Sequence, residues 1–217
     1  MMKKNRTELV FILDKSGSML GLEKDTIGGY NAMLEKQRAV AGECVITTVL
    51  FHNRYELLHD RMDIRAVRPI TEKEYEVGGS TALLDAIGMA IHKIKTAQDN
   101  TAEEFRAEKV MFVIITDGEE NASREYSAET VKGLIEQQKE CDWEFIFLGA
   151  NIDAVETAGR FGIDTDRAVD YVPDGEGTAL NFSVMGDTVA AFRACGALPT
   201  GCLDAIREDQ EKRGDRR

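Results

Sequence analysis

The stretch that decides the fold is Leu9-Val10-Phe11-Ile12-Leu13-Asp14-Lys15-Ser16-Gly17-Ser18. It begins as a continuous apolar run and changes at Asp14 to charged, hydroxyl-bearing and glycine residues. A short run of β-branched, aromatic and leucine residues without polar alternation is typical of a strand covered on both faces, as in parallel sheets. We therefore expect a buried parallel strand over residues 9–13, with a polar loop at its carboxyl end.

Four further apolar runs repeat this pattern, at residues 44–51, 110–115, 145–148 and, more weakly, 168–172. Apolar stripes with helical spacing lie between them, and the strongest consists of Leu83, Ile87, Ala90, Ile91 and Ile94. Alternation of buried strands with amphipathic helices predicts right-handed crossovers and helices on both faces of a sheet. The expected fold is a three-layer α/β sandwich with a mostly parallel, Rossmann-like sheet.

One segment interrupts the alternation. Residues 55–64 follow a predicted strand after only His52-Asn53-Arg54, which is too short for a crossover helix. Charged and apolar residues mix there, so we expect an antiparallel edge strand joined by a hairpin. No linker, repeat or low-complexity segment divides the chain, and we expect a single domain over residues 1–198. The charge-rich residues 199–217 are expected to form a frayed helix or a disordered tail.

Composition narrows the function classes. The 217 residues include 39 acidic and 27 basic side chains, for a net charge of −12, and no basic stripe favours nucleic-acid binding. No apolar run approaches the roughly 20 residues that span a bilayer, and the first run is too short for a secretory signal. The four cysteines form no C-x-x-C pair and have no zinc spacing with the three histidines. We therefore expect a cytoplasmic protein with reduced thiols, without a membrane or nucleic-acid partner.

Polar residues gather where the predicted strands end. Asp14, Ser16 and Ser18 follow the first strand at alternate positions, and Asp117 follows another buried strand. Thr81 lies just before the strongest predicted helix. Loops after neighbouring central strands meet at one edge of an open α/β sheet, where the strand order reverses. We therefore expect these five side chains to lie within reach of one point.

The five side chains offer two carboxylates and three hydroxyls, without imidazole or thiolate. These hard oxygen donors suit Mg²⁺, or Mn²⁺ in its place, in octahedral geometry at roughly 2.0–2.1 Å. Ca²⁺ usually takes more carboxylates and more ligands. The set leaves room for water, and an acidic side chain of a partner protein could take one of the exchangeable positions.

Each of these segments also has a purely structural interpretation. Ser16 and Ser18 could cap the first crossover helix, and Asp117-Gly118 could form a turn. For the neighbouring polar residues we expect structural roles: Asp85 in local hydrogen bonds, Glu119 and Glu120 on the rim, and Asn151 and Asp153 as helix caps.

The pattern Asp14-x-Ser16-x-Ser18 with Thr81 and Asp117 resembles the metal-ion-dependent adhesion site (MIDAS) of von Willebrand factor A (vWA) domains. All five positions hold the expected residue types. Three further stretches are similar to prokaryotic members: Ile27-Gly28-Gly29-Tyr30-Asn31, Gly79-Ser80-Thr81-Ala82-Leu83-Leu84-Asp85-Ala86 and Thr116-Asp117-Gly118-Glu119-Glu120-Asn121. The resemblance covers residues 7–192, and it implies a mostly parallel six-stranded sheet between helices with one short antiparallel edge strand.

The resemblance also implies roles for the site residues. Ser16 and Ser18 would coordinate the metal through their hydroxyls, and Thr81 would do so in a ligand-ready state and through water otherwise. Asp14 and Asp117 would act mainly through water or by orienting hydroxyls. An Asp or Glu of a partner protein would complete the octahedron. Proteins that resemble this one commonly work inside larger assemblies, including assemblies built around ATPases.

Three functional classes follow from the sequence. The first is a metal-dependent protein-binding module that is not an enzyme, and the complete adhesion-site pattern favours it. The second is a metal-dependent hydrolase or phosphotransferase. Against it, the chain lacks an Asp-x-Asp pair after the first strand, both Gly-rich nucleotide motifs and a histidine in the three loops. The third is a scaffold bound through another face, and its binding would survive chelation of metal.

Overall fold

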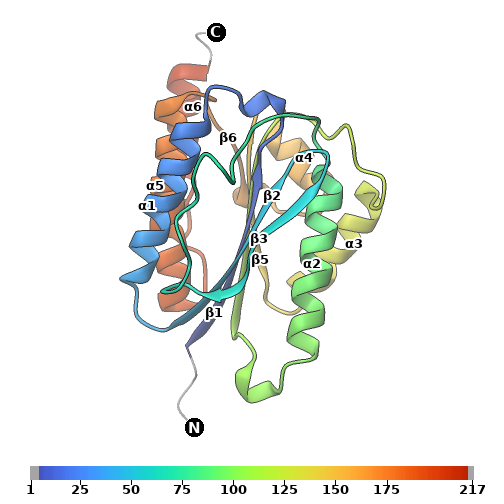
Figure 1. Cartoon of the computed structure of the whole chain (residues 1–217), viewed down its shortest axis with the longest axis vertical. Coiled ribbons are helices and arrows are strands. Elements are labelled where there is room, and N and C mark those ends of the chain that lie inside the picture. The colour runs from blue at the N-terminus through green and yellow to red at the C-terminus, as the bar shows by residue number, and fades with distance from the viewer. Residues whose placement is uncertain (1–4, 215–217) are drawn as a thin grey trace.

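The computed structural model describes residues 5–214, which form one six-stranded sheet in the order β3-β2-β1-β4-β5-β6 with helices on both faces (Figure 1). The strands are β1 (Arg6–Asp14), β2 (Glu43–Phe51), β3 (Tyr55–Asp63), β4 (Lys109–Asp117), β5 (Glu144–Ala150) and β6 (Ala168–Asp170). The helices are α1 (Glu23–Arg38), α2 (Leu83–Asp99), α3 (Ala128–Lys139), α4 (Ala154–Arg160), α5 (Gly175–Cys195) and α6 (Asp204–Arg213). Short 3-10 turns occur at η1 (Gly17–Met19), η2 (Glu103–Phe105) and η3 (Thr165–Arg167).

The central strand β1 is buried on both faces, as its apolar run predicts. Leu9, Phe11 and Leu13 point into the core beneath α1 and α5, whereas Val10 and Ile12 point into the core beneath α2 and α3. All five are at most 1% exposed. Because successive strand side chains point to opposite faces, a strand between two helical layers needs apolar residues at every position. The three-layer α/β fold expected from the sequence is confirmed.

The hairpin at the sheet edge is also confirmed. Strand β3 pairs antiparallel with β2, beginning at Phe51 opposite Tyr55, while the other neighbouring pairs are parallel. The β2–β3 register shifts on either side of Thr48, and on β3 Arg61 has a positive φ of 46°. Such irregularities bend an edge strand and re-aim its side chains.

The expectation of a frayed or disordered tail needs correction, because residues 204–213 form helix α6. Leu203 and Ile206 are 0% and 1% exposed and belong to the core that α5 also covers. The Arg207 guanidinium donates to three backbone carbonyls of residues 165–168. Two apolar residues in a charged segment are a weak sequence signal for a packed helix. They are enough to hold α6 in place because β6 and α5 lie beside it. Residues 215–217 lie outside the described residues.

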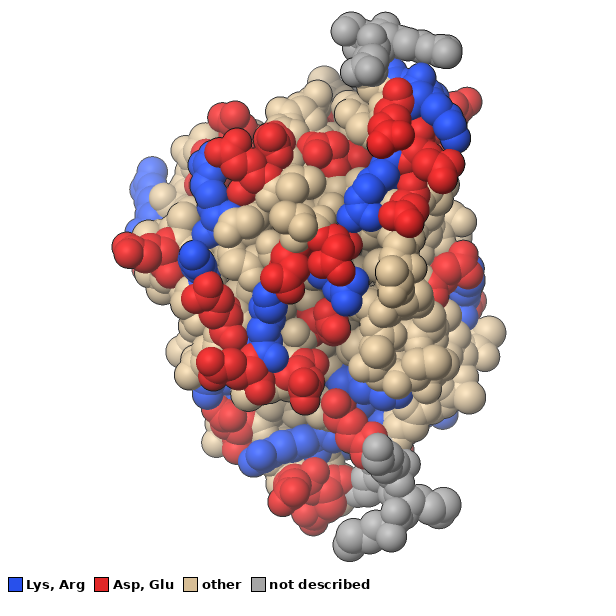
Figure 2. Space-filling model, turned by 180° about the vertical axis from the view of Figure 1, so that it is seen from behind, with Lys and Arg blue, Asp and Glu red and all other residues tan. Residues whose placement is uncertain are grey.

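Charged side chains cover the face opposite to that of Figure 1. Figure 2 shows basic and acidic side chains interspersed there, without a continuous basic area. Several ion pairs of the described residues are exposed, and such pairs contribute little stability each. Among the described residues, no helix has the length and apolar character that crossing a membrane requires.

Candidate metal site

The carboxyl ends of β1, β4 and β5 form one edge of the sheet. The register pairs Leu13 with Ile115 and Asp117 with Ala150. Asp14 therefore stands level with Thr116, and the loop after β1 begins beside the loop after β4. The structure thus brings the segment from Asp14 to Ser18 and the segment that contains Asp117 together, at the sheet edge where open α/β sheets bind ligands.

Asp14 ties the ends of β1 and β4 together. Its side chain is 1% exposed, and its Oδ1 accepts a hydrogen bond from the Ser16 N–H at 2.7 Å. Its Oδ2 accepts from the Thr116 hydroxyl at 2.7 Å and from the Asp117 N–H at 3.3 Å. Burial raises the pKa of the Asp14 carboxyl, and these hydrogen bonds oppose the rise. All of these donors are neutral.

The hydroxyls of Ser16 and Ser18 face each other, with 3.0 Å between their Oγ atoms. Ser16 precedes the short turn η1 but makes no side-chain capping hydrogen bond. Helix α1 begins after Leu22, which also provides no side-chain cap. The capping interpretation of the two serines is therefore wrong, and their hydroxyls are available for another partner.

Thr81 joins the site through the loop after β4. A Cβ atom added to Gly118 would lie 3.2 Å from Ser18 Oγ and 3.8 Å from Thr81 Oγ1, so both hydroxyls lie close to Gly118. Gly118 has a φ of +148°, a backbone conformation that residues other than glycine rarely adopt. The Thr81 N–H donates to Asn121 Oδ1 at 2.9 Å, and the Thr81 carbonyl accepts from the Asn121 N–H at 3.0 Å. These hydrogen bonds fix the Thr81 segment to the loop after β4.

The Asp117 side chain accepts a hydrogen bond from a residue that was expected to cap a helix. The Asn151 amide Nδ2 donates to Asp117 Oδ1. Burial raises the pKa of Asp117, the Asn151 hydrogen bond lowers it, and the nearby charge of Asp14 raises it. The capping role expected for Asn151 is therefore wrong, whereas that of Asp153 is confirmed, because Asp153 accepts from the Glu156 N–H at 2.7 Å. The sequence alone could not reveal this contact, because it depends on strand order: Asn151 follows Ala150, which pairs with Asp117 across β4 and β5.

The acidic neighbours have structural roles. Asp85 accepts hydrogen bonds from the N–H groups of Arg124, Glu125 and Tyr126, each at 2.9 Å. The expected hydrogen-bonding role is confirmed, but the expectation of local partners is wrong, because these donors lie 39–41 residues away in the chain. Glu120 was expected on the rim together with Glu119, but its carboxylate accepts from the N–H groups of Leu84, Ala122 and Ser123. It thereby fastens the loop after β4 to the start of α2, and only Glu119 is exposed.

The two site carboxylates have no positively charged partner. Among residues 5–214, no Lys, Arg or His nitrogen lies within 4.0 Å of Asp14 or Asp117, which are 1% and 2% exposed. Lys15, the neighbour of Asp14 in the chain, pairs instead with Glu56 at 2.8 Å. Burying carboxylates without a compensating charge is unfavourable. The arrangement therefore fits a bound cation that supplies the missing charge.

The donor set decides which cation fits. Asp14, Ser16, Ser18, Thr81 and Asp117 present oxygen alone, as Mg²⁺ and Mn²⁺ prefer. No group of three or more His, Cys, Asp or Glu side chains in the described part of the chain is placed to hold a metal. A hollow of about 430 Å³ adjoins the site, and it is lined by Ser18, Leu20, Gly21, Leu22, Asp117, Asn151, Pro173, Asp174 and Gly175.

A larger hollow of about 1080 Å³ lies at the opposite edge of the sheet, beside the amino ends of β4 and β5. Its basic side chains are already engaged. Lys139 pairs with Asp164 at 2.8 Å, Arg167 pairs with Glu144 at 3.4 Å, and Lys109 donates to Asn5 Oδ1 at 2.7 Å. Each basic side chain that lines the larger hollow therefore already has an acceptor.

Comparison with known proteins shows the fold. No family model matches the sequence, and the search of curated proteins returned no relative. Among solved structures, proximal thread matrix protein 1 (PTMP1) from the mussel byssus is 13% identical, with a TM-score of 0.56 over 85% of this chain and 46% of that one. The ArnB paralog VWA2 from Sulfolobus acidocaldarius is 19% identical, with a TM-score of 0.51 over 86% of this chain and 44% of that one.

A von Willebrand factor type A protein from Catenulispora acidiphila is 14% identical, with a TM-score of 0.56 over 85% of this chain and 42% of that one. PTMP1 has also been solved with its MIDAS motif occupied by zinc, and that structure is 11% identical with a TM-score of 0.55. The chain spans less than half the length of these structures. At such identities the likeness establishes one thing: the chain has the Rossmann-like α/β fold of vWA domains.

Proposed function

We propose that this chain is a divalent-cation-dependent protein-binding module. Mg²⁺, or Mn²⁺ in its place, would be held by Asp14, Ser16, Ser18, Thr81 and Asp117. The observation that carries the proposal is the convergence of two buried carboxylates and three hydroxyls without a positively charged side chain. PTMP1, which shares this fold, has been solved with zinc in its MIDAS motif, and this supports a divalent cation at the proposed site.

The donor set also supports an acidic partner. Three of the five donors are neutral hydroxyls, so a bound dication would retain attraction for a further anion. We propose that an Asp or Glu side chain of a partner protein provides it. The hollow beside Ser18 and Asp117 gives such a side chain an approach. Leu20 on its border is 76% exposed and offers the partner an apolar contact beside the cation.

We further propose that the chain has no catalytic activity and works in the cytoplasm. His52 lies near the site, because its carbonyl accepts from the Ala82 N–H at 2.8 Å. Its ring is engaged within its own hairpin: Nδ1 accepts from the Arg54 N–H at 2.9 Å, and Nε2 lies 3.6 Å from Glu56. The described loops around the proposed metal site therefore contain no imidazole that is free to act as a general base. The four cysteines are unpaired, which suits a reducing compartment.

A matched pair of serine substitutions tests cation binding. Mg²⁺ at about tenfold above Kd should stabilise the wild type by about 1.4 kcal/mol, or roughly 3–6 °C in Tm. Ser18→Ala should lose this shift. Ser127→Ala removes another exposed serine, the cap of α3, and should lower the basal Tm while keeping the Mg²⁺ shift. A wild type that shows no shift with Mg²⁺, Mn²⁺ or Zn²⁺, or a Ser18→Ala variant with the full shift, would contradict the proposed site.

A second measurement tests the acidic partner. Acetate represents the partner carboxylate, and acetamide is a neutral probe of the same size. In the Mg²⁺-loaded protein, we expect acetate but not acetamide to shift the backbone amide NMR signals of Ser18 and Gly118. Removal of Mg²⁺ with EDTA should abolish the acetate shifts. Equal shifts with and without Mg²⁺ would contradict a cation that accepts carboxylate, and would favour a scaffold bound through another face.

A further inference from the structure

The loop after β5 brings a fourth segment to the proposed metal site. Asn151 is its first residue, and its amide Nδ2 donates to Asp117 Oδ1. Among the hydrogen bonds of the described residues, this is the only one that the Asp117 carboxylate accepts. The other carboxylate oxygen, Oδ2, receives no such donor. Asn151 therefore holds one end of the carboxylate and leaves the other oxygen available.

The backbone directs the Asn151 side chain to this position. Asn151 has φ +55°, and among the described non-glycine residues only Arg61 and Asp142 also have positive φ. Asparagine tolerates this left-handed conformation better than most residues do. Since the preceding Ala150 pairs with Asp117 across β4 and β5, a left-handed turn at 151 returns the side chain toward Asp117. The same side chain borders the hollow beside the metal site.

The chemistry of the contact matters as much as its position. Asp14 has hydrogen-bond donors on both carboxylate oxygens, whereas Asp117 has a donor on one only. A lysine or arginine beside Asp117 would neutralise the charge that a cation needs. A neutral amide orients the carboxylate without neutralising it. Residues that orient metal-binding groups through hydrogen bonds typically change metal affinity by about 10–100-fold.

From this geometry we propose that Asn151 is a positioning residue of the metal site, which turns Asp117 so that its free oxygen faces the cation or a water bound to it. This inference rests on the proposed function, because it assumes that the cation binds at Asp117. It assigns a role to the loop after β5, which the five-residue pattern does not include.

Asn151→Gly is the sharpest test, because glycine readily adopts the left-handed backbone and the substitution removes the side chain that carries the amide. Titration calorimetry with MgCl₂ should show an affinity about tenfold or more below that of the wild type. The matched control is Asp142→Gly. Asp142 also has a left-handed backbone, with φ +59°, but it lies before β5 at the opposite edge of the sheet. This control should bind Mg²⁺ with wild-type affinity.

A spectroscopic readout separates positioning from a general effect on folding. The side-chain NH₂ signals of Asn151, identified by their loss in Asn151→Gly, should shift when Mg²⁺ is added to the wild type. Full Mg²⁺ affinity in Asn151→Gly, beside a loss in Ser18→Ala, would overturn the inference and leave the proposed function intact. Equal losses in Asn151→Gly and Asp142→Gly would also overturn it. A wild type that binds no Mg²⁺ would instead overturn the proposed function.

Discussion

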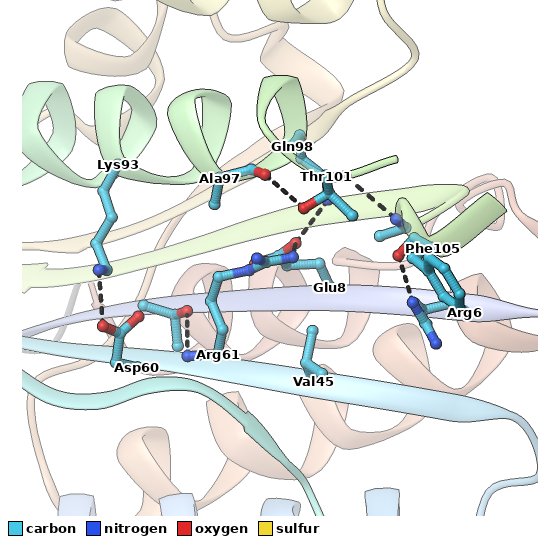
Figure 3. A network of polar contacts seen from close by, with 12 residues as sticks. Arg6, Glu8, Val45, Asp60, Arg61, Lys93, Ala97, Gln98, Thr101 and Phe105 are labelled. Carbon is cyan, nitrogen blue, oxygen red and sulfur yellow. Dashed lines mark hydrogen bonds and ion pairs between the residues drawn. The ribbon is translucent and has the colours of Figure 1, made fainter. Parts of the chain in front are cut away.

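Strand β1 carries a buried carboxylate near each end, and the protein treats the two differently. Glu8 is 0% exposed and accepts from the Arg61 guanidinium at 2.6 and 3.0 Å and from Gln98 Nε2 at 2.6 Å. Figure 3 shows Arg61 and Gln98 converging on Glu8, beside the ion pair of Lys93 with Asp60. Asp14 at the other end is 1% exposed and accepts only from neutral donors.

The difference separates a carboxylate that has a positively charged partner from one that has only neutral donors. Burial raises the pKa of both groups, and at Glu8 the Arg61 hydrogen bond and charge oppose the rise. At Glu8 the compensating charge is part of the fold and holds β1, β3 and α2 together. At Asp14 the fold provides neutral hydrogen-bond donors that orient the carboxylate but do not compensate its charge. The same is true of Asp117 beside it. A buried carboxylate without a protein cation is therefore the better indicator of a ligand site.

The largest expected effect comes from breaking the Glu8 pair. Arg61→Asn removes the guanidinium, and asparagine tolerates the left-handed backbone at this position. We expect a loss of about 3–5 kcal/mol in the free energy of unfolding, because the substitution leaves an uncompensated buried charge. Urea denaturation at neutral pH measures this loss.

Arg65→Asn is the matched control for Arg61→Asn. Arg65 pairs with Asp63 close to the end of β3, and its side chain is 77% exposed. We expect no measurable change in stability for this variant, since exposed pairs are solvated and screened. Similar losses in the two variants would show that Glu8 is not the reason for the sensitivity at Arg61.

An intermediate effect distinguishes the two carboxylates by their response to metal. At a Mg²⁺ concentration about tenfold above Kd, the wild type and Glu8→Gln should each gain about 1.4 kcal/mol of stability. Asp14→Asn should gain nothing, because the substitution removes a charge on which cation binding depends. Urea denaturation with and without Mg²⁺ measures each gain. If Glu8→Gln lost the Mg²⁺ gain and Asp14→Asn kept it, the assignment of the two roles would be reversed.

The smallest effect is a pH dependence in the metal-free protein. Burial raises the pKa of Asp14 and of Asp117 above the usual value of 3.8. The folded state then binds more protons than the unfolded state between 3.8 and the raised pKa, so these groups lower stability as pH rises through that window. Asp14→Asn removes one of them.

The variant provides the control for this pH dependence. As pH rises above about 4, the stability of the wild type should fall relative to that of Asp14→Asn. Mg²⁺ favours the ionised carboxylates, so its Kd should decrease over the same range. Urea denaturation at a series of pH values measures the first trend, and calorimetry measures the second. If the stability of the wild type instead rose relative to that of the variant as pH increased, the hydrogen bonds that lower the pKa of Asp14 would outweigh the burial that raises it.

Much of the fold could be predicted from local pattern. The run from Leu9 to Leu13 is apolar at every position because both faces of β1 are covered, and the central parts of β4 and β5 follow the same rule, whereas β2 also buries Thr47 and Thr48. The α2 stripe at helical spacing is buried as expected. Helix α6 could not be predicted with the same security, because only Leu203 and Ile206 anchor it and both depend on neighbours distant in the sequence.

The candidate site was predictable in its donors but not in its support. Asp14 ends β1, and Ser16 and Ser18 follow within four residues, so their spacing is visible in the chain. The role of Asn151 was not visible, because an asparagine before Asp153 looks like a helix cap, and only the pairing of β4 with β5 places it at Asp117. The role of Glu120 was hidden in the same way, since its partner N–H groups include that of Leu84.

Residues close together in the chain were enough to predict where the strands lie, which oxygen donors end them and that the chemistry suits a hard cation, because these properties are local. Which buried carboxylate receives a compensating charge could be seen only in the folded chain. Arg61 brings its charge to Glu8 from a position 53 residues away, whereas in the described part of the chain Asp14 accepts only from neutral groups such as the Thr116 hydroxyl. Charge compensation inside a protein depends on distances of a few ångströms across the fold, and strand order and register set those distances.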